Sequence, residues 1–333
     1  MPKCPACGAD IAVGAQECQS CHVTYDEPLV REHQEQGGRK MGAVECYTEM
    51  ISRDQPSVIM FLIDQSGSMG DSFGGMLEGV ANPTKEQGAA DALNRCLQNI
   101  VIRCTKEEGV RNYFDIGVIG YGASVGPVLG GILAKRELVP IAEVADAPLR
   151  VEERTREVPD AAGGLTTETV RLPIWVDPKA EGRTPMCEAL QLARRVIEPW
   201  LSSHAQSYPP TVINITDGAS TDGEPGPMAK ELKALANANG SNLLAFNIHL
   251  CDARVPSVLY PAHVGGLTDG FAKQLFEMSS LLPPKLVAEA AAGRVPVVEG
   301  SRGFVFNGSL ADLIRFLDIG TRMTAMTDVR PGR

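Results

Sequence analysis

The sequence predicts a doubly wound α/β domain, in which helices cover both faces of a mostly parallel sheet. Short apolar runs alternate along the chain with amphipathic segments of helical period, which is the order of strands and helices in such folds. The runs are apolar at nearly every position, as expected for parallel strands that are buried on both faces. Aromatic residues make up 5% of the chain, so the core must be mostly aliphatic.

Two strands and a long helix are predicted in the first part of this domain. Residues 57–63 (SVIMFLI) and 113–121 (YFDIGVIGY) are the apolar runs. Between them, residues 84–104 place apolar side chains at the i, i+3, i+4 spacing of an amphipathic helix. Thr84 and Gln87 have the spacing of a capping box, which predicts where that helix begins.

The second part of the domain continues the alternation. Thr184 is expected to cap a helix over residues 184–197, with Pro185 in the first turn, where a proline sacrifices no hydrogen bond. Further elements are expected in the order strand 211–216, helix 227–239, strand 242–250, helix 269–279, strand 303–306 and helix 309–319. The domain is therefore expected to span residues 56–320, followed by a flexible tail over residues 321–333.

Residues 124–180 interrupt this alternation and are interpreted as an insertion. Within it, residues 149–158 and 166–176 alternate on either side of DAAGG, as the two strands of a β-hairpin do. Residues 25–55 are polar and then mixed in character, and we interpret them as a linker that precedes the domain.

The first 24 residues carry two pairs of cysteines and are interpreted as a small zinc ribbon. Cys4, Cys7, Cys18 and Cys21 form the pattern C-x2-C-x10-C-x2-C. Two such pairs make a closed tetrahedral sulfur site, which suits Zn²⁺. A segment this short cannot build a core, so the metal would supply its folding energy.

The same segment also contains the attachment string of c-type haem. Cys18, Cys21 and His22 spell C-x-x-C-H. The haem interpretation leaves the first cysteine pair unexplained, and the opening residues MPKCPACGAD show no apolar export signal. Zinc is therefore favoured over haem. Basic and aromatic residues are not interleaved here, so a protein contact is favoured over a nucleic acid.

Charge and cysteine content restrict the function classes. The net charge of −10 argues against general binding to nucleic acids or anionic membranes, because both need a basic face. No stretch approaches the roughly 20 apolar residues of a membrane helix. The chain has nine cysteines, an odd number, and several of them are scattered along it. This distribution indicates reduced thiols and not a disulfide framework. A cytoplasmic protein is therefore expected.

Side-chain oxygens follow two of the predicted strands. Asp64, Ser66 and Ser68 come after the first strand, and Asp217 comes directly after the strand 211–216. In open α/β sheets, ligands bind beyond the carboxyl ends of the strands, and Thr184 at its helix cap can point to the same edge. An all-oxygen set with two carboxylates suits a hard divalent cation, Mg²⁺ or Mn²⁺.

The order of these motifs is similar to that of a known family. D-x-S-x-S over residues 64–68, T-P at residues 184–185 and T-D-G at residues 216–218 resemble the metal-ion-dependent adhesion site of von Willebrand factor A domains. The similarity covers roughly residues 56–320. It implies that the two serines and Thr184 coordinate the metal directly, and that the two aspartates act mainly through water.

The resemblance implies a protein-binding module and not an enzyme. The bound metal would bridge to an Asp or Glu of a partner protein. Together with the zinc ribbon, the chain is similar to bacterial intracellular proteins of this family, including those of tellurium-resistance and related stress or defence gene clusters. Kinases, phosphatases and AAA+ ATPases are therefore candidate partners.

Two other functions are compatible with the same residues. A metal-dependent phosphoesterase would use the ion to polarise a phosphoryl oxygen, but no nucleophile and base pair is evident near the motif. A subunit of a chelatase-type AAA+ machine would need another chain for ATP hydrolysis, because the sequence contains no P-loop string.

Several other polar residues are given simpler interpretations. Asp222 and Glu224 could hold a second cation, but a solvated loop is the simpler interpretation. His204, His249 and His263 have no partner at a metal-ligand spacing, so each is interpreted as structural or exposed.

Overall fold

The computed structural model describes residues 47, 49, 51–73, 82–159, 165–250, 256–267, 269–293, 295–308, 312 and 315. The chain divides into two units, residues 1–44 and 45–333, and all described residues belong to the second. The predicted zinc ligands Cys4, Cys7, Cys18 and Cys21 lie outside the described residues, as do the tail 321–333 and most of the predicted helix 309–319. The zinc ribbon therefore stays a prediction.

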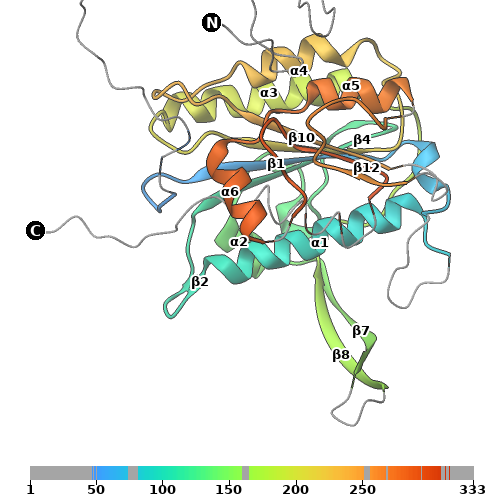
Figure 1. The fold of residues 1–333 in the computed structure, drawn as a ribbon. Coiled ribbons are helices and arrows are strands. Elements are labelled where there is room, and N and C mark those ends of the chain that lie inside the picture. The colour runs from blue at the N-terminus through green and yellow to red at the C-terminus, as the bar shows by residue number, and fades with distance from the viewer. Residues whose placement is uncertain are drawn as a thin grey trace, which may run out of the picture. The chain divides into compact units, whose positions relative to one another are not determined.

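The second unit is built around an eight-stranded sheet with helices on both faces (Figure 1). Its strand order is β11-β12-β10-β9-β1-β4-β5, with β6 paired to β4. Five strands run parallel: β1 (Ser57–Asp64), β4 (Phe114–Tyr121), β9 (Thr211–Thr216), β10 (Leu244–His249) and β12 (Phe304–Phe306). The short strands β5 (Val125–Pro127), β6 (Val139–Pro140) and β11 (Val258–Leu259) pair antiparallel to them. The predicted fold class is confirmed.

Helices cover the two faces of the sheet in two groups (Figure 1). One face carries α3 (Met186–Ser203), α4 (Pro225–Lys233) and α5 (Gly270–Met278). The other carries α1 (Lys85–Cys104), α2 (Ile141–Asp146) and α6 (Pro284–Ala292). The described residues of the main body also form two 3₁₀ turns, η1 (Gly67–Gly70) and η2 (Gly131–Leu133), and a small ribbon of β2 (Thr105–Lys106) and β3 (Gly109–Val110).

The central strand β1 shows why the apolar runs are continuous. All eight of its residues are buried. Alternate side chains point to opposite faces of a strand. Accordingly, Ile59, Phe61 and Ile63 join the core under α1, and Val58, Met60 and Leu62 join the core under α3. Both faces of the strand need apolar side chains, so apolar and polar residues do not alternate along it.

Two helices end where the sequence did not predict. α3 continues past residue 197 to Ser203 with Pro199 inside it, because Trp200 and Leu201 are buried in the core beyond the proline. α4 ends at Lys233 and not at residue 239. There the Asn237 side-chain oxygen accepts hydrogen bonds from the backbone N–H groups of Asn239 and Ser241, which forms a turn in place of a helix.

The predicted hairpin is present as β7 (Arg150–Pro159) and β8 (Leu165–Ile174), paired antiparallel from Arg150↔Ile174 to Pro159↔Leu165. It projects from the main body below α1 (Figure 1). Its base is attached to α1 through Asn94, whose side-chain oxygen accepts from the N–H groups of Trp175 and Val176 at 2.9 and 3.1 Å. The Asn94 amide also donates to the Val176 carbonyl at 2.9 Å.

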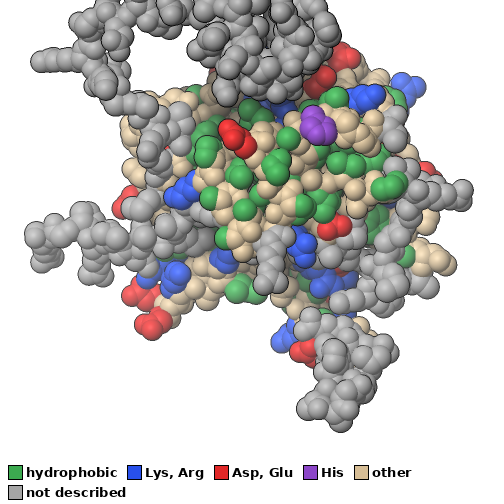
Figure 2. Space-filling model, in the orientation of Figure 1, with side chains coloured by type: hydrophobic (Ala, Val, Ile, Leu, Met, Phe, Trp, Pro, Cys, Tyr) green, Lys and Arg blue, Asp and Glu red, His purple; other side chains and the backbone are tan. Residues whose placement is uncertain are grey.

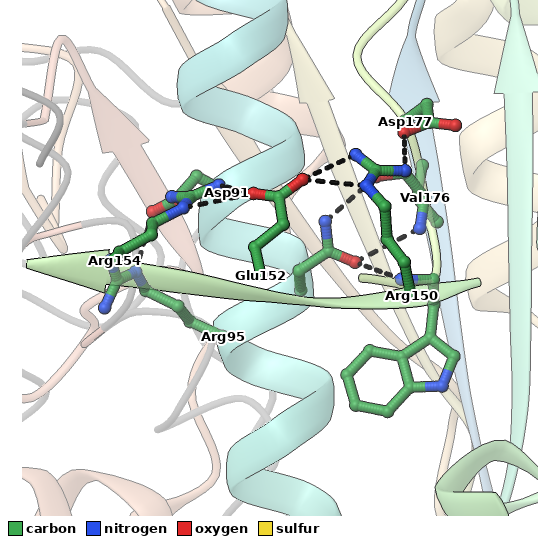
Figure 3. A network of polar contacts seen from close by, with 9 residues as sticks. Asp91, Arg95, Arg150, Glu152, Arg154, Val176 and Asp177 are labelled. Carbon is green, nitrogen blue, oxygen red and sulfur yellow. Dashed lines mark hydrogen bonds and ion pairs between the residues drawn. The ribbon is translucent and has the colours of Figure 1, made fainter. Parts of the chain in front are cut away.

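A network of charged side chains extends this attachment (Figure 3). Asp91 of α1 is buried and pairs with Arg95, at 2.7 Å, and with Arg154 of β7. Arg154 also binds Glu152 at 2.9 Å. Glu152 in turn accepts from Arg150, whose guanidinium reaches Asp177 at 2.6 Å. The hairpin is thus held to the body by buried contacts of Asn94 and Asp91, whereas the pair of Arg150 with Asp177 at the end of the network is exposed.

Residues before β1 also contribute to this unit. Ile51 is fully buried in the core under α1. Glu49 accepts hydrogen bonds from the side chains of Asn237 and Asn239 at 2.6 and 3.1 Å. The end of the segment interpreted as a linker therefore packs on the body.

The described surface is mixed in character. On the face drawn in Figure 2, hydrophobic, basic and acidic side chains are interspersed over the described residues. No helix in the described part of the chain is long and apolar enough to span a membrane.

Candidate metal centre

Asp64 ends β1 at the carboxyl edge of the sheet and is almost fully buried. One carboxylate oxygen, Oδ1, accepts the backbone N–H of Ser66 at 2.8 Å. The other, Oδ2, accepts the hydroxyl of Thr216 at 2.6 Å. Burial raises the pKa of Asp64 to about 6, and the hydrogen bonds from Thr216 and Ser66 offset part of that rise. Two short hydrogen bonds therefore fix the orientation of this carboxylate.

The two serines connect β1 to β9. Ser66 is buried and directly precedes η1, whereas Ser68 lies within η1 and is exposed. Their hydroxyl oxygens are 3.2 Å apart. The Ser68 hydroxyl also donates to Asp217 Oδ1 at 2.8 Å. A chain of hydrogen bonds therefore runs from the loop after β1 to the loop after β9.

Asp217 directly follows β9, and its side chain is only 1% exposed. Its second oxygen, Oδ2, accepts from the ammonium of Lys85 at 2.7 Å. Lys85 is the first residue of α1. The structure thus brings Asp64, Ser66, Ser68 and Asp217 together, and adds a cation that the sequence analysis did not identify.

Thr184 lies at the same edge, although its hydroxyl is not part of this chain of hydrogen bonds. Its backbone N–H donates to the Thr221 hydroxyl at 3.0 Å, and its carbonyl accepts the Thr221 N–H at 2.9 Å. Within the described residues, no hydrogen bond joins its side chain to the other four candidate ligands. Its role as a metal ligand therefore stays a prediction.

Three loops approach one another at backbone distance near Thr184. The N–H of Gly67 donates to the carbonyl of Gly182 at 3.1 Å, and the N–H of Glu181 donates to the carbonyl of Gln65 at 2.7 Å. Gly182 has a φ of +84°, and a Cβ atom there would lie 2.4 Å from the backbone N of Ala123. Only glycine fits this position, because both the conformation and the space exclude a side chain.

The expectation that Thr184 caps α3 is wrong. The helix begins at Met186, and Pro185 is the residue before it. Its N–H groups are capped by Asp222 from the loop after β9, which accepts from Cys187 and Glu188 at 3.0 and 2.9 Å. Burial acts to raise the pKa of Asp222, but the Ser220 hydroxyl and these N–H groups outweigh it and lower the pKa. Asp222 therefore holds α3 and the loop that carries Asp217 together.

The donor set fits a small, hard cation. Neighbouring ligands around Mg²⁺, each at about 2.0–2.1 Å, are separated by about 2.9 Å in an octahedron. The separations between the two serine oxygens, 3.2 Å, and between Ser68 and Asp217, 2.8 Å, are close to this value. Among the described residues, no group of three or more His, Cys, Asp or Glu is arranged for a metal. A site here would depend on hydroxyl oxygens beside two carboxylates.

A buried polar row below the site was not predicted from the sequence. The Tyr121 hydroxyl donates to Asn214 at 2.7 Å, and the Asn214 amide donates to Asn247 at 3.1 Å. The Asn247 amide in turn donates to the Ser279 hydroxyl at 2.9 Å. The row runs from β4 past β1 to β9 and β10 and ends at Ser279 after α5, so the two asparagines, each in an otherwise apolar strand, are partners on adjacent strands. The apolar pattern of each strand could not indicate these hydrogen-bond partners, because they lie on other elements.

His249 ends β10 and is buried, in line with a structural role. Its ring stacks on Phe306, with centroids 5.3 Å apart and planes 5° from parallel. Neither ring nitrogen has a hydrogen-bond partner among the described residues. Burial lowers the pKa of His249, so the neutral ring is favoured.

Comparisons with known proteins give partial structural matches. No protein-family model and no curated protein matches the chain. One solved structure that matches is the vWF domain of the type V pili tip protein Mfa5 from Porphyromonas gingivalis, with 14% identity over 50% of this chain and 39% of that chain and a TM-score of 0.27.

Two further structures match in a similar way. The ArnB paralog VWA2 from Sulfolobus acidocaldarius is 14% identical over 60% of this chain and 36% of that chain, with a TM-score of 0.28. The PilB minor pilin from Streptococcus sanguinis is 9% identical over 80% of this chain and 61% of that chain, with a TM-score of 0.37. Each match covers less than two thirds of the other chain. The fold class of this protein therefore rests on its own strand order.

Proposed function

We propose that this chain binds a partner protein through a divalent cation, Mg²⁺ or Mn²⁺, at the carboxyl edge of its sheet. The observation that supports the proposal is a chain of hydrogen bonds, from Asp64 to the backbone N–H of Ser66 and from the Ser66 hydroxyl through Ser68 to Asp217, that brings these side-chain oxygens together. These residues, with Thr184, also occupy the positions of a von Willebrand factor A adhesion motif, a resemblance that comes from the sequence. The bound ion would offer an open position to an Asp or Glu carboxylate of the partner.

The residues of the chain would have distinct tasks. Ser66 and Ser68 present neutral oxygens, which leave the ion electrophilic enough to attract an outside acid. Asp64 and Asp217 supply negative charge from buried positions. Thr216 orients Asp64, while Thr221 and Asp222 hold the Thr184 loop against the Asp217 loop.

We extend the proposal to a non-enzymatic module in the cytoplasm. The proposed acidic ligand follows from the site chemistry, whereas a kinase, phosphatase or AAA+ partner and a stress or defence pathway rest on the family resemblance alone. The second metal centre, Zn²⁺ on the four N-terminal cysteines, is proposed from their spacing.

The test is a titration of the purified full chain with MgCl₂ by isothermal titration calorimetry. Wild type should bind one Mg²⁺ at this edge, and Asp64→Ala should bind at least about tenfold more weakly, a difference of about 1.4 kcal/mol. Asp54→Ala is the matched control, because Asp54 is an exposed aspartate before β1, at the opposite end of that strand. Equal Mg²⁺ affinity in wild type and Asp64→Ala would contradict the proposal.

Partner capture gives the second half of the test. The immobilised chain should retain binding proteins when MgCl₂ is present and release them when it is omitted. Asp64→Ala should retain none of them while its near-ultraviolet circular dichroism stays that of wild type. If the same proteins are retained without Mg²⁺ and by Asp64→Ala, the partner binds at another surface of the chain.

A further inference from the structure

Lys85 lies against the candidate metal site in a position that helix stability does not explain. It is the first residue of α1, where the positive end of the helix dipole disfavours a cation. Its ammonium nevertheless contacts Asp217 Oδ2 at 2.7 Å, with Asp71 Oδ2 further away at 3.9 Å. The Lys85 side chain is 12% exposed, so the contact with Asp217 is shielded from water.

The Lys85 backbone is also held in place. Its N–H donates to the carbonyl of Asp71 at 3.0 Å, and Gln87 accepts the N–H of the preceding Thr84 at 3.1 Å. The start of α1 is thus fixed beside the loop that carries both serines. The ammonium therefore reaches Asp217 from an anchored base.

The charges at this edge set the balance between a cation and an acidic ligand. Asp64 and Asp217 contribute two buried negative charges, and Lys85 contributes one positive charge. The side chain of Asp71 is 73% exposed, so water screens its charge and it adds little to the field at the site. A divalent cation added to the two buried carboxylates and the ammonium leaves the site with a net charge of +1. Without Lys85 the same sum is zero, and the site has less attraction for a carboxylate.

We infer that Lys85 makes the binding of the divalent cation and of an acidic ligand interdependent. The lysine repels the cation and neutralises the Asp217 oxygen that faces it, so the cation alone binds weakly. A carboxylate that approaches the loaded site meets a net positive charge, so the two ligands together bind more tightly than their separate affinities imply. This inference rests on the proposed metal-dependent function.

The experiment compares wild type, Lys85→Arg and Lys85→Met as full chains, with MgCl₂ titrated by calorimetry at constant ionic strength in chloride and in acetate. Acetate is the carboxylate probe. Lys85→Met should bind Mg²⁺ in chloride at least about tenfold more tightly than wild type. Acetate should tighten Mg²⁺ binding several-fold in wild type and Lys85→Arg, and by a smaller factor in Lys85→Met, where only the ion itself attracts the carboxylate.

The outcomes separate the inference from the proposal on which it rests. Equal Mg²⁺ affinities in all three proteins would overturn the role of Lys85 and leave metal binding intact. Failure of all three to bind Mg²⁺ would overturn both. Binding by Lys85→Met that exceeds that of the two cationic proteins supports the inference, even if wild type alone binds too weakly to measure.

A second variant is included in case Lys85→Met does not fold. Loss of Lys85 leaves Asp217 buried without its cation, so Lys85→Gln, which keeps a hydrogen-bond donor, is measured in parallel. For both variants, Mg²⁺ should raise the melting temperature more than it does for wild type, because at a given Mg²⁺ concentration a tighter-binding ligand stabilises the folded state more. A smaller rise in both variants than in wild type would contradict the inference.

Discussion

Aspartate side chains are buried in two regions of the molecule, and their carboxylates have different hydrogen-bond partners in the two. At the base of the hairpin, Asp91 is paired with Arg95 and Arg154, so guanidinium groups occupy both of its oxygens. At the sheet edge, Asp64 is held by a hydroxyl and a backbone N–H, and Asp217 by a hydroxyl and a single lysine.

Under the proposed function, the difference distinguishes an acid that only stabilises the fold from acids that would bind a cation. Arginine forms a rigid, planar fork that saturates a carboxylate and remains charged. Hydroxyl groups can rotate and become ligands themselves, so the carboxylates beside them stay accessible to a cation. Burial alone therefore does not identify a binding acid, whereas the kind of partner does.

The largest expected effect concerns the ion pairs of Asp91 with Arg95 and Arg154. Asp91→Asn should lower the free energy of unfolding by about 3 kcal/mol, because two partly buried guanidinium groups lose their common counter-charge. Urea denaturation measures this loss. Mg²⁺ affinity should remain that of wild type, and a loss below about 1 kcal/mol would show that the network is not structural.

Asp64 at the sheet edge should make the stability of the metal-free protein depend on pH. The pKa of Asp64 is raised to about 6 by burial, above its unfolded value of 3.8. The stability that it contributes is therefore complete below about pH 4 and is lost as the pH rises through 6, a change of about 3 kcal/mol in the metal-free protein. Denaturation of wild type against Asp64→Asn from pH 4 to 7.5 measures it.

Mg²⁺ should reverse the trend, because the cation requires the ionised carboxylate. Metal affinity is then expected to fall below about pH 6 in wild type. A stability difference between wild type and Asp64→Asn that does not change with pH would contradict the conclusion that burial outweighs the hydrogen bonds to Asp64.

A smaller effect is expected where Asn94 attaches the hairpin to α1, away from the candidate metal site. Asn94→Ala removes three buried hydrogen bonds to Trp175 and Val176, so the free energy of unfolding should fall by about 2 kcal/mol. Limited proteolysis should then cut the hairpin faster. Gln98→Ala is the matched control, because Gln98 makes one exposed contact with the Arg171 carbonyl.

The smallest effect concerns the loop that joins the two halves of the site. Asp222→Ala removes the cap of α3 and should cost about 1 kcal/mol, measured by thermal denaturation. It should also weaken Mg²⁺ binding modestly, since the cap fixes the loop beside Thr184. Unchanged stability would indicate that water replaces the carboxylate at the helix end.

The sequence predicted the sheet and the acids at its edge because both depend on local pattern. Residues 57–63 and 211–216 are continuous apolar runs, and the residues that follow them, Asp64 and Asp217, must lie at the carboxyl edge once the strands are parallel.

The parts that were missed depend on tertiary partners. Asp91 and Asn94 lie on the buried side of α1, where periodicity predicts apolar residues, and only the docked hairpin explains them. Lys85 looks like an ordinary residue of a first helical turn until β9 brings Asp217 to it. Asp222 caps a helix that begins 36 residues earlier in the chain, at Met186, a relation with no local signature.

The backbone bonds that join the loops around residues 65, 122 and 182 have a consequence for divergence among related chains. Main-chain hydrogen bonds and a glycine set the close approach of these loops, so that approach does not depend on the exposed side chains that the loops carry. Glu181 and Arg183, on the same loop and exposed, can be exchanged without disturbing that approach. A new binding preference could thus arise on an unaltered scaffold, one surface substitution at a time.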